Sequence, residues 1–73
     1  GTPAPVQSVK LNDRERHFLQ LSATELTYVQ IADKMSVSPR TVDGYREALF
    51  EKMNAKSRVG LVLEGLRLGL ITL

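Results

Sequence analysis

Residues 27–53, TYVQIADKMSVSPRTVDGYREALFEKM, decide the fold, because two helix starts and a short turn lie within them. Thr27 is a favoured N-cap residue, and Gln30 completes a capping box three residues later. Apolar residues follow at helical spacing. The pattern predicts a helix over residues 27–35.

A second helix is predicted over residues 38–53. Ser38 is a favoured N-cap, and Pro39 is favoured at the first position of a helix. The short connection Ser36-Val37-Ser38, which ends at the cap of the second helix, joins the two predicted helices. Two helices joined by so short a turn fit a helix-turn-helix, although a plain αα-hairpin has the same outline.

The flanking sequence predicts one further helix on each side. The first covers residues 12–23, where Asn12 is the N-cap and Glu15 completes a capping box. The last covers residues 57–69, where Ser57 is the N-cap. Since no segment favours a strand, we expect an all-α, four-helix domain.

Length and composition limit what this domain can be. The chain has 73 residues, which is enough for one domain, and we expect residues 1–10 to be a linker or cloning remnant and 11–73 to be the domain. It has no cysteine and a single histidine, His17, so we expect no disulfide, metal or cofactor site and no enzyme activity. No segment is long and apolar enough to span a membrane, and the lack of cysteine agrees with a cytoplasmic location.

The apolar positions at helical spacing are expected to form the core. They are Leu11, Phe18, Leu19 and Leu21 in the first helix, Val29, Ile31, Ala32 and Met35 in the second, Val42, Tyr45, Leu49 and Met53 in the third, and Val59, Val62, Leu63, Leu66 and Leu70 in the fourth.

From Leu11 to Ile71 the chain resembles the LuxR/GerE-type helix-turn-helix domain. The matching segments are Leu11-Asn12-Asp13-Arg14-Glu15, Ile31-Ala32, Ser38-Pro39-Arg40-Thr41-Val42, Lys52-Met53, Ser57-Arg58 and Gly69-Leu70-Ile71. This domain is the DNA-binding output module of NarL/FixJ-type response regulators and of quorum-sensing regulators. The resemblance implies that the third helix enters the major groove of double-stranded DNA, that the fourth helix can mediate homodimerisation, and that a longer protein carries an N-terminal receiver or ligand-binding domain.

The base-contacting positions implied by the resemblance are Asp43, Gly44 and Glu47, with Arg46 beside them. The first and third are often basic in the family, whereas here both are acidic. Either a carboxylate accepts a hydrogen bond from a cytosine amino group while Gly44 allows close approach, or Asp43 pairs with Arg40 and Arg46 and contacts no base. For Tyr45, packing into the core is favoured over a phosphate contact.

The candidate phosphate-contacting residues lie near the two ends of the third helix. Ser38, Arg40 and Thr41 stand at its start, where free backbone N–H groups favour an anion. Lys52 and Lys56 lie at its end, although they also fit a solvated group of charges.

The fourth helix has a second apolar stripe opposite its expected core face. Leu61, Gly65 and Leu68 recur at i, i+4 and i+7, with Glu64 beside them. We expect this stripe to be exposed in the monomer and to form a two-fold contact between helices, with Gly65 allowing close approach.

Two functions remain after these exclusions. The first is a sequence-specific DNA-binding domain of a transcriptional regulator, of the response-regulator or the quorum-sensing type. The second is a helix-turn-helix module used for protein binding, which the three acidic residues of the segment 38–53 favour because they cancel its three basic ones.

Overall fold

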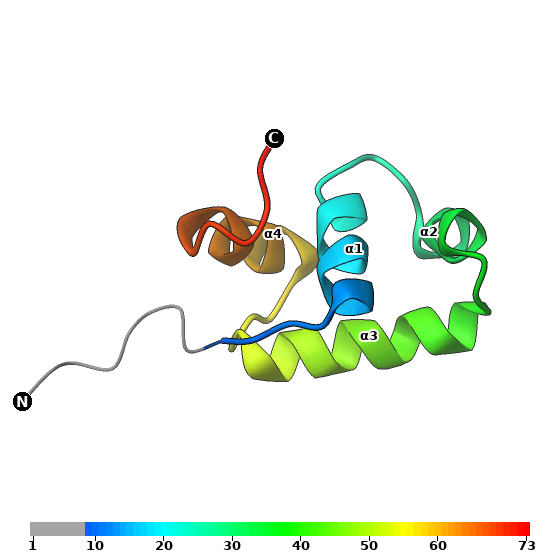
Figure 1. Ribbon diagram of the computed structural model, residues 1–73, viewed down its shortest axis with the longest axis horizontal. Coiled ribbons are helices and arrows are strands. Elements are labelled where there is room, and N and C mark those ends of the chain that lie inside the picture. The colour runs from blue at the N-terminus through cyan, green and yellow to red at the C-terminus, as the bar shows by residue number, and fades with distance from the viewer. Residues whose placement is uncertain (1–8) are drawn as a thin grey trace, which may run out of the picture.

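The computed structural model describes residues 9–73, in which four α-helices and no strands are found (Figure 1). The helices are α1 (Asp13–Ser22), α2 (Tyr28–Met35), α3 (Pro39–Lys52) and α4 (Arg58–Arg67). The predicted all-α, four-helix fold is confirmed. Most of the expected linker, residues 1–8, lies outside the described residues. Val9 already packs against the core, two residues before the expected start of the domain.

All four predicted N-caps are confirmed. The side chains of Asn12, Thr27, Ser38 and Ser57 each accept a hydrogen bond from the backbone N–H three residues later. Both predicted capping boxes are also present, at the starts of α1 and α2. The predicted helix end that differs most from the structure is that of α4, which ends at Arg67 and not at residue 69. The helix stops there because the chain turns into the left-handed region at Gly69, with φ +73°.

α3 lies along one edge of the molecule, and the other three helices all lie on the same side of it (Figure 1). α1 is central and packs against α2, α3 and α4. Among residues 9–73, no other helix therefore covers the long side of α3 that faces away from α1 (Figure 1).

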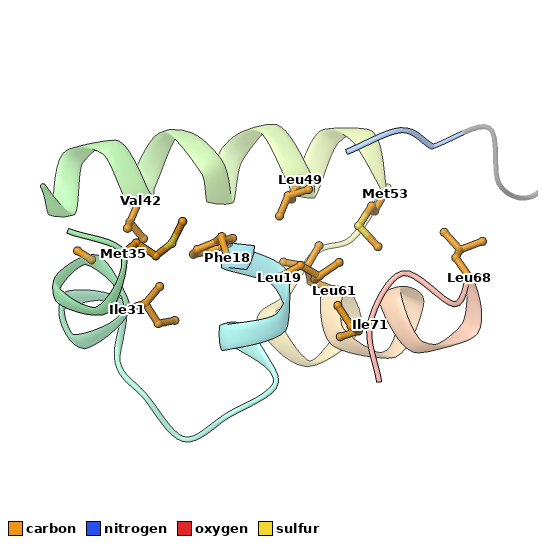
Figure 2. Close-up of a cluster of buried hydrophobic side chains, with 11 residues drawn as sticks. Phe18, Leu19, Ile31, Met35, Val42, Leu49, Met53, Leu61, Leu68 and Ile71 are labelled. Carbon is orange, nitrogen blue, oxygen red and sulfur yellow. The ribbon is translucent and has the colours of Figure 1, made fainter. Parts of the chain in front are cut away.

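The core fills the space between α3 and the other helices (Figure 2). Its largest fully buried side chains are Phe18, Leu19, Ile31, Leu49, Leu61 and Val42. Within residues 9–73, none of the helices has the length and apolar character needed to cross a bilayer.

The expectation for the faces of α4 is wrong. Leu61 and Gly65 are buried and Leu68 is 9% exposed, so the expected dimerisation stripe is part of the core. By contrast, Val59 and Leu63 were expected in the core and are 68% and 60% exposed. Val62, Leu66 and Leu70 lie between these extremes and are partly buried.

The contacts of Gly65 explain this orientation. A Cβ atom at this glycine would lie 3.1 Å from Leu19 Cδ2 and 3.1 Å from Ile71 Cγ1. α1 and the C-terminal segment thus approach α4 closely at Gly65, which is buried and has no side chain. The glycine allows packing inside the monomer, not the approach of a second copy.

Val29 was also expected in the core and is 64% exposed. α2 has only eight residues, of which Ile31, Ala32 and Met35 are buried and Tyr28 is partly buried against the core. Val29 lies outside that arc and faces solvent.

Candidate nucleic-acid interface

The turn between α2 and α3 is tight and well bonded. Ser36 ends α2 in the left-handed region with φ 58°, and the N–H of Val37 donates to the carbonyl of Ala32 at 3.0 Å. Val37 packs against the core, which fixes the angle at which the chain enters α3. The α2–turn–α3 unit is a helix-turn-helix, as predicted.

The start of α3 presents two linked hydroxyls. Ser38 Oγ accepts from the Thr41 N–H at 3.2 Å and lies 3.0 Å from Thr41 Oγ1. Both side chains are exposed, as is Arg40 between them. The capping role of Ser38 is confirmed, while phosphate contacts by these three residues stay a prediction.

The uncovered face of α3 carries the expected base-contacting residues Asp43, Gly44 and Glu47, all exposed, and also Glu51. Asp43 Oδ1 lies 3.8 Å from Arg46 Nη2, so the Arg46 partner of the pairing alternative is observed. Among residues 9–73, neither Arg40 nor Glu47 takes part in an ion pair.

Arg46 lies between α3 and α2. Its guanidinium carbon is 5.5 Å from the centre of the Tyr28 ring, within cation–π distance. Its Nε is buried and donates to no acceptor in the described part of the chain. Of the four expected base-contacting residues, Arg46 is therefore the one whose side chain is directed toward Tyr28 of α2.

Tyr45 packs inward, as favoured from the sequence. Its ring centre lies 6.2 Å from that of Phe18, which in turn stacks on Tyr28 at 5.9 Å. These three rings connect α1, α2 and α3. The rings support the helix-turn-helix from its buried side.

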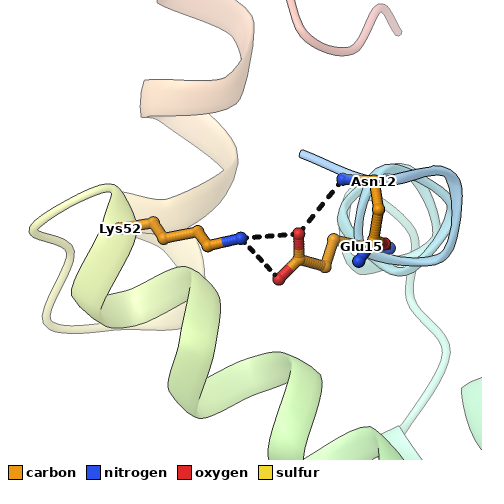
Figure 3. Close-up of polar contacts among 3 residues, drawn as sticks. All are labelled: Asn12, Glu15 and Lys52. Carbon is orange, nitrogen blue, oxygen red and sulfur yellow. Dashed lines mark hydrogen bonds and ion pairs between the residues drawn. The ribbon is translucent and has the colours of Figure 1, made fainter. Parts of the chain in front are cut away.

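Lys52 is held by a partner that the sequence does not reveal. Its Nζ donates to both carboxylate oxygens of Glu15, at 2.8 and 2.9 Å, and Glu15 also accepts from the Asn12 N–H (Figure 3). Burial alone raises the pKa of Glu15, but the hydrogen bonds from Lys52 and Asn12 and the charge of Lys52 outweigh it and lower the pKa.

This ion pair changes the expectation for the phosphate contacts. Lys52 joins the end of α3 to the start of α1, and its charge is already compensated by Glu15. It is therefore an intradomain anchor in this structure. Lys56, in the turn after α3, is exposed and remains a candidate.

Arg58 has a positioning role that the sequence did not reveal. It donates to the carbonyls of Ser22 at 3.0 Å and Thr24 at 2.9 Å, and its guanidinium carbon lies 5.0 Å from the Tyr28 ring centre. Arg58 thus fastens the α1–α2 loop to the start of α4. Only its place directly after the Ser57 cap could have hinted at this, since its partners are more than 30 residues away.

The outward face of α4 is apolar and borders a shallow groove. Val59, Val62 and Leu63 line this groove together with Ala23 and Thr24 of the α1–α2 loop. Glu64, expected at a dimer contact, instead pairs with Arg67 at 2.7 Å within the helix. Arg67 lowers the pKa of Glu64 by hydrogen bonding and by its charge.

Comparison of the sequence with known proteins finds bacterial regulatory proteins. The chain is similar to the transcription regulator BvgA of Bordetella pertussis, with 42% identity over 52 residues, covering 71% of the chain and 25% of that protein. It is 36% identical over 61 residues to the response regulator GacA of Pseudomonas aeruginosa, covering 84% of the chain and 28% of GacA.

A third relative is the response regulatory protein YgeK of Escherichia coli K12, 33% identical over 64 residues, which cover 88% of the chain and 44% of YgeK. The chain thus spans less than half the length of these relatives. No solved structure matches it. Residues 9–64 match the family of bacterial regulatory proteins described as the luxR family. The chain belongs to this luxR family of bacterial regulatory proteins, and its four helices form the family's helix-turn-helix domain.

Proposed function

We propose that this domain binds double-stranded DNA sequence-specifically as the output domain of a transcriptional response regulator, with α3 in the major groove. The observation that carries the proposal is the uncovered long side of α3, which is the second helix of the helix-turn-helix (Figure 1). An α-helix fits the width of the major groove, and in helix-turn-helix proteins the second helix occupies it.

The charges around α3 support this orientation. Arg40 lies at the start of the helix, where two exposed hydroxyls and the positive end of the helix dipole also favour a phosphate group. Lys56 lies beyond its other end. We infer that these two ends hold the DNA backbone and that the middle of the helix faces the bases.

The dependence of DNA affinity on salt tests the proposal. If α3 lies in the groove, log affinity falls linearly with log salt, with a slope of about −0.9 for each phosphate contacted. Arg40→Ala should reduce that slope by about 1 and weaken binding to all sequences similarly. Arg67→Ala is the charge-matched control, because α4 lies across the domain from the uncovered side of α3 (Figure 1). Equal slopes for both variants would contradict the proposed orientation.

The second candidate function is binding of a basic protein partner through the acidic residues of α3. The exposed carboxylates of Asp43, Glu47 and Glu51 favour it. This function predicts that the 73-residue chain has no measurable affinity for duplex DNA at low salt. The salt titration therefore separates the two functions.

The relatives support a proposal for the other partners of this domain, a receiver domain and a second copy of the protein. Two are response regulators, and the chain spans less than half of each. We propose that the domain follows an N-terminal receiver domain in a longer cytoplasmic protein and that the protein binds DNA as a homodimer.

For the homodimer, we propose the outward face of α4, which includes Val59 and Leu63, in place of the buried stripe. A charge at Leu63 should weaken self-association and reduce DNA affinity without unfolding the domain, because this side chain is 60% exposed. Leu73→Glu is the matched control, since Leu73 is 89% exposed at the C-terminus. Sedimentation equilibrium with and without DNA measures the effect. Dimerisation that persists in Leu63→Glu would rule out this face.

A further inference from the structure

The two carboxylates in the middle of α3 have different surroundings. Asp43 lies 3.8 Å from Arg46, whose guanidinium is itself drawn toward Tyr28 on the side of the helix. Glu47 is exposed and takes part in no ion pair or side-chain hydrogen bond among residues 9–73. Asp43 therefore has an intramolecular partner, whereas Glu47 has its full hydrogen-bonding capacity available.

Gly44 lies on the same face as Glu47, three residues before it. A Cβ atom at Gly44 would meet nothing within 4 Å, and the residue lies within a regular helix. Neither packing nor backbone geometry inside the domain requires a glycine here, although glycine weakens a helix relative to alanine. Because it has no side chain, Gly44 lets a partner surface come close to the helix backbone beside Glu47.

We propose that Glu47 is a specificity-determining residue that selects a cytosine in the DNA half-site. This inference rests on the proposed function, in which the uncovered side of α3 faces the major groove. In that groove cytosine presents only its N4 amino donor, which a carboxylate accepts. Guanine presents two acceptors, O6 and N7, and thymine presents O4, so a carboxylate is repelled by both.

Adenine is discriminated less strongly but in the same direction. It presents an N6 amino donor beside the N7 acceptor, so one oxygen of the carboxylate gains a hydrogen bond while the other is repelled. A neutral amide in place of Glu47 matches adenine better, because its N–H donates to N7 while its carbonyl accepts from N6. Glu47→Gln should therefore change the preferred base at one position of the half-site.

The test is selection of bound duplexes from a random DNA pool by the 73-residue chain and by two variants, Glu47→Gln and Asp43→Asn. Each variant replaces one carboxylate by an amide of the same shape at an exposed position of α3. We expect the original chain to enrich a half-site with a cytosine at one position. In Glu47→Gln that preference should fall by about 5- to 150-fold and move toward adenine, as expected for one base-specific contact. Asp43→Asn should keep the cytosine.

Each outcome has a distinct meaning. Cytosine enrichment that survives Glu47→Gln but is lost in Asp43→Asn would overturn the assignment of the two carboxylates. An equal gain in affinity for all sequences in Glu47→Gln would show that the carboxylate only repels phosphate, which also overturns it. If the original chain enriches no sequence and shows no salt-dependent DNA binding, the proposed function itself fails, and a basic protein partner becomes the better explanation of the acidic face.

Discussion

α3 and α4 use their two faces in different ways. α3 buries apolar side chains such as Val42 and Leu49 on one side and leaves charged ones on the other. α4 is apolar on both sides: Leu61 is fully buried, while Leu63, two residues later, is 60% exposed. An amphipathic helix identifies its own buried face, whereas a helix with two apolar faces is oriented by its neighbours.

The difference also separates two kinds of interaction surface. The exposed side of α3 is polar and carries carboxylates, which accept hydrogen bonds from donors such as the amino groups of base edges. The exposed side of α4 is apolar around Val59 and Leu63, which suits a second protein surface. One domain thus presents two chemically distinct surfaces, on helices that are both held by α1.

The largest expected effect distinguishes the two leucines of α4. Leu61→Ala should lower the free energy of unfolding by about 2–5 kcal/mol, because it leaves a cavity in the core. Leu63→Ala should change it by about 0.5 kcal/mol or less, as for an ordinary surface position. Urea denaturation followed by circular dichroism measures both. If Leu63→Ala is the more destabilising change, the orientation of α4 described above is wrong.

The sequence predicted α3 better than α4 for a physical reason. On α3 the charged residues Asp43 and Glu47 exclude one face from the core, so the periodicity has a single solution. On α4 both stripes are apolar, and the choice depends on the close approach of Leu19 and Ile71 to Gly65. No local pattern contains that information, because it comes from the folding of the C-terminal segment against α1.

In the candidate interface, too, the contacts between residues far apart in the sequence could not be predicted from local patterns. The caps and the exposed residues of α3 follow from neighbouring sequence, and they were predicted. The partner of Lys52 is 37 residues away, and Arg58 contacts a loop more than 30 residues away. Long side chains of this kind have many accessible partners, so only the tertiary structure distinguishes an anchor from a phosphate contact.

The second-largest expected effect tests whether Gly65 of α4 is packed against its neighbours. Gly65→Val should destabilise the domain by about 1–3 kcal/mol, as is usual when extra methyl groups are forced into a packed core. The first added carbon already lies 3.1 Å from Leu19 and Ile71. Thermal unfolding measures the loss. An unchanged or higher Tm would mean that Gly65 faces open space, as the exposed-stripe expectation required.

The third effect concerns how α3 is anchored. Lys52→Met should destabilise the domain by about 1–2 kcal/mol near neutral pH, because the Glu15 carboxylate stays buried without its cation. The pKa of Glu15 is lowered in the folded state, so its stabilising contribution is complete above the ordinary glutamate pKa of 4.5 and is lost as the pH falls through the lowered value. The original chain should therefore lose stability in acid.

In Lys52→Met that acid dependence should largely disappear, since burial raises the pKa of Glu15 and only the hydrogen bond from Asn12 remains to lower it. The difference in unfolding free energy between the two proteins should then shrink from neutral pH to about pH 3. Arg67→Met is the matched control on α4: it removes an ion pair whose carboxylate, Glu64, is 33% exposed, whereas that of Glu15 is 7% exposed, so its effect should be smaller. A difference for Lys52→Met that stays constant with pH would mean that Glu15 does not titrate as this geometry requires.

The smallest effect should have the opposite sign and lies on α3. Gly44→Ala should stabilise the domain by about 1 kcal/mol, because alanine favours a helix interior over glycine. The new methyl group meets no atom within 4 Å, so no packing strain offsets the gain. For a domain of this size the Tm should rise by about 4–8 °C. A gain in stability accompanied by weaker DNA binding would indicate that Gly44 is needed for a ligand on the uncovered face. Gly65, on the packed face of α4, is needed for folding instead. If Gly44→Ala instead lowers the Tm, the face of α3 around it is covered, and the contrast between the two helices does not hold.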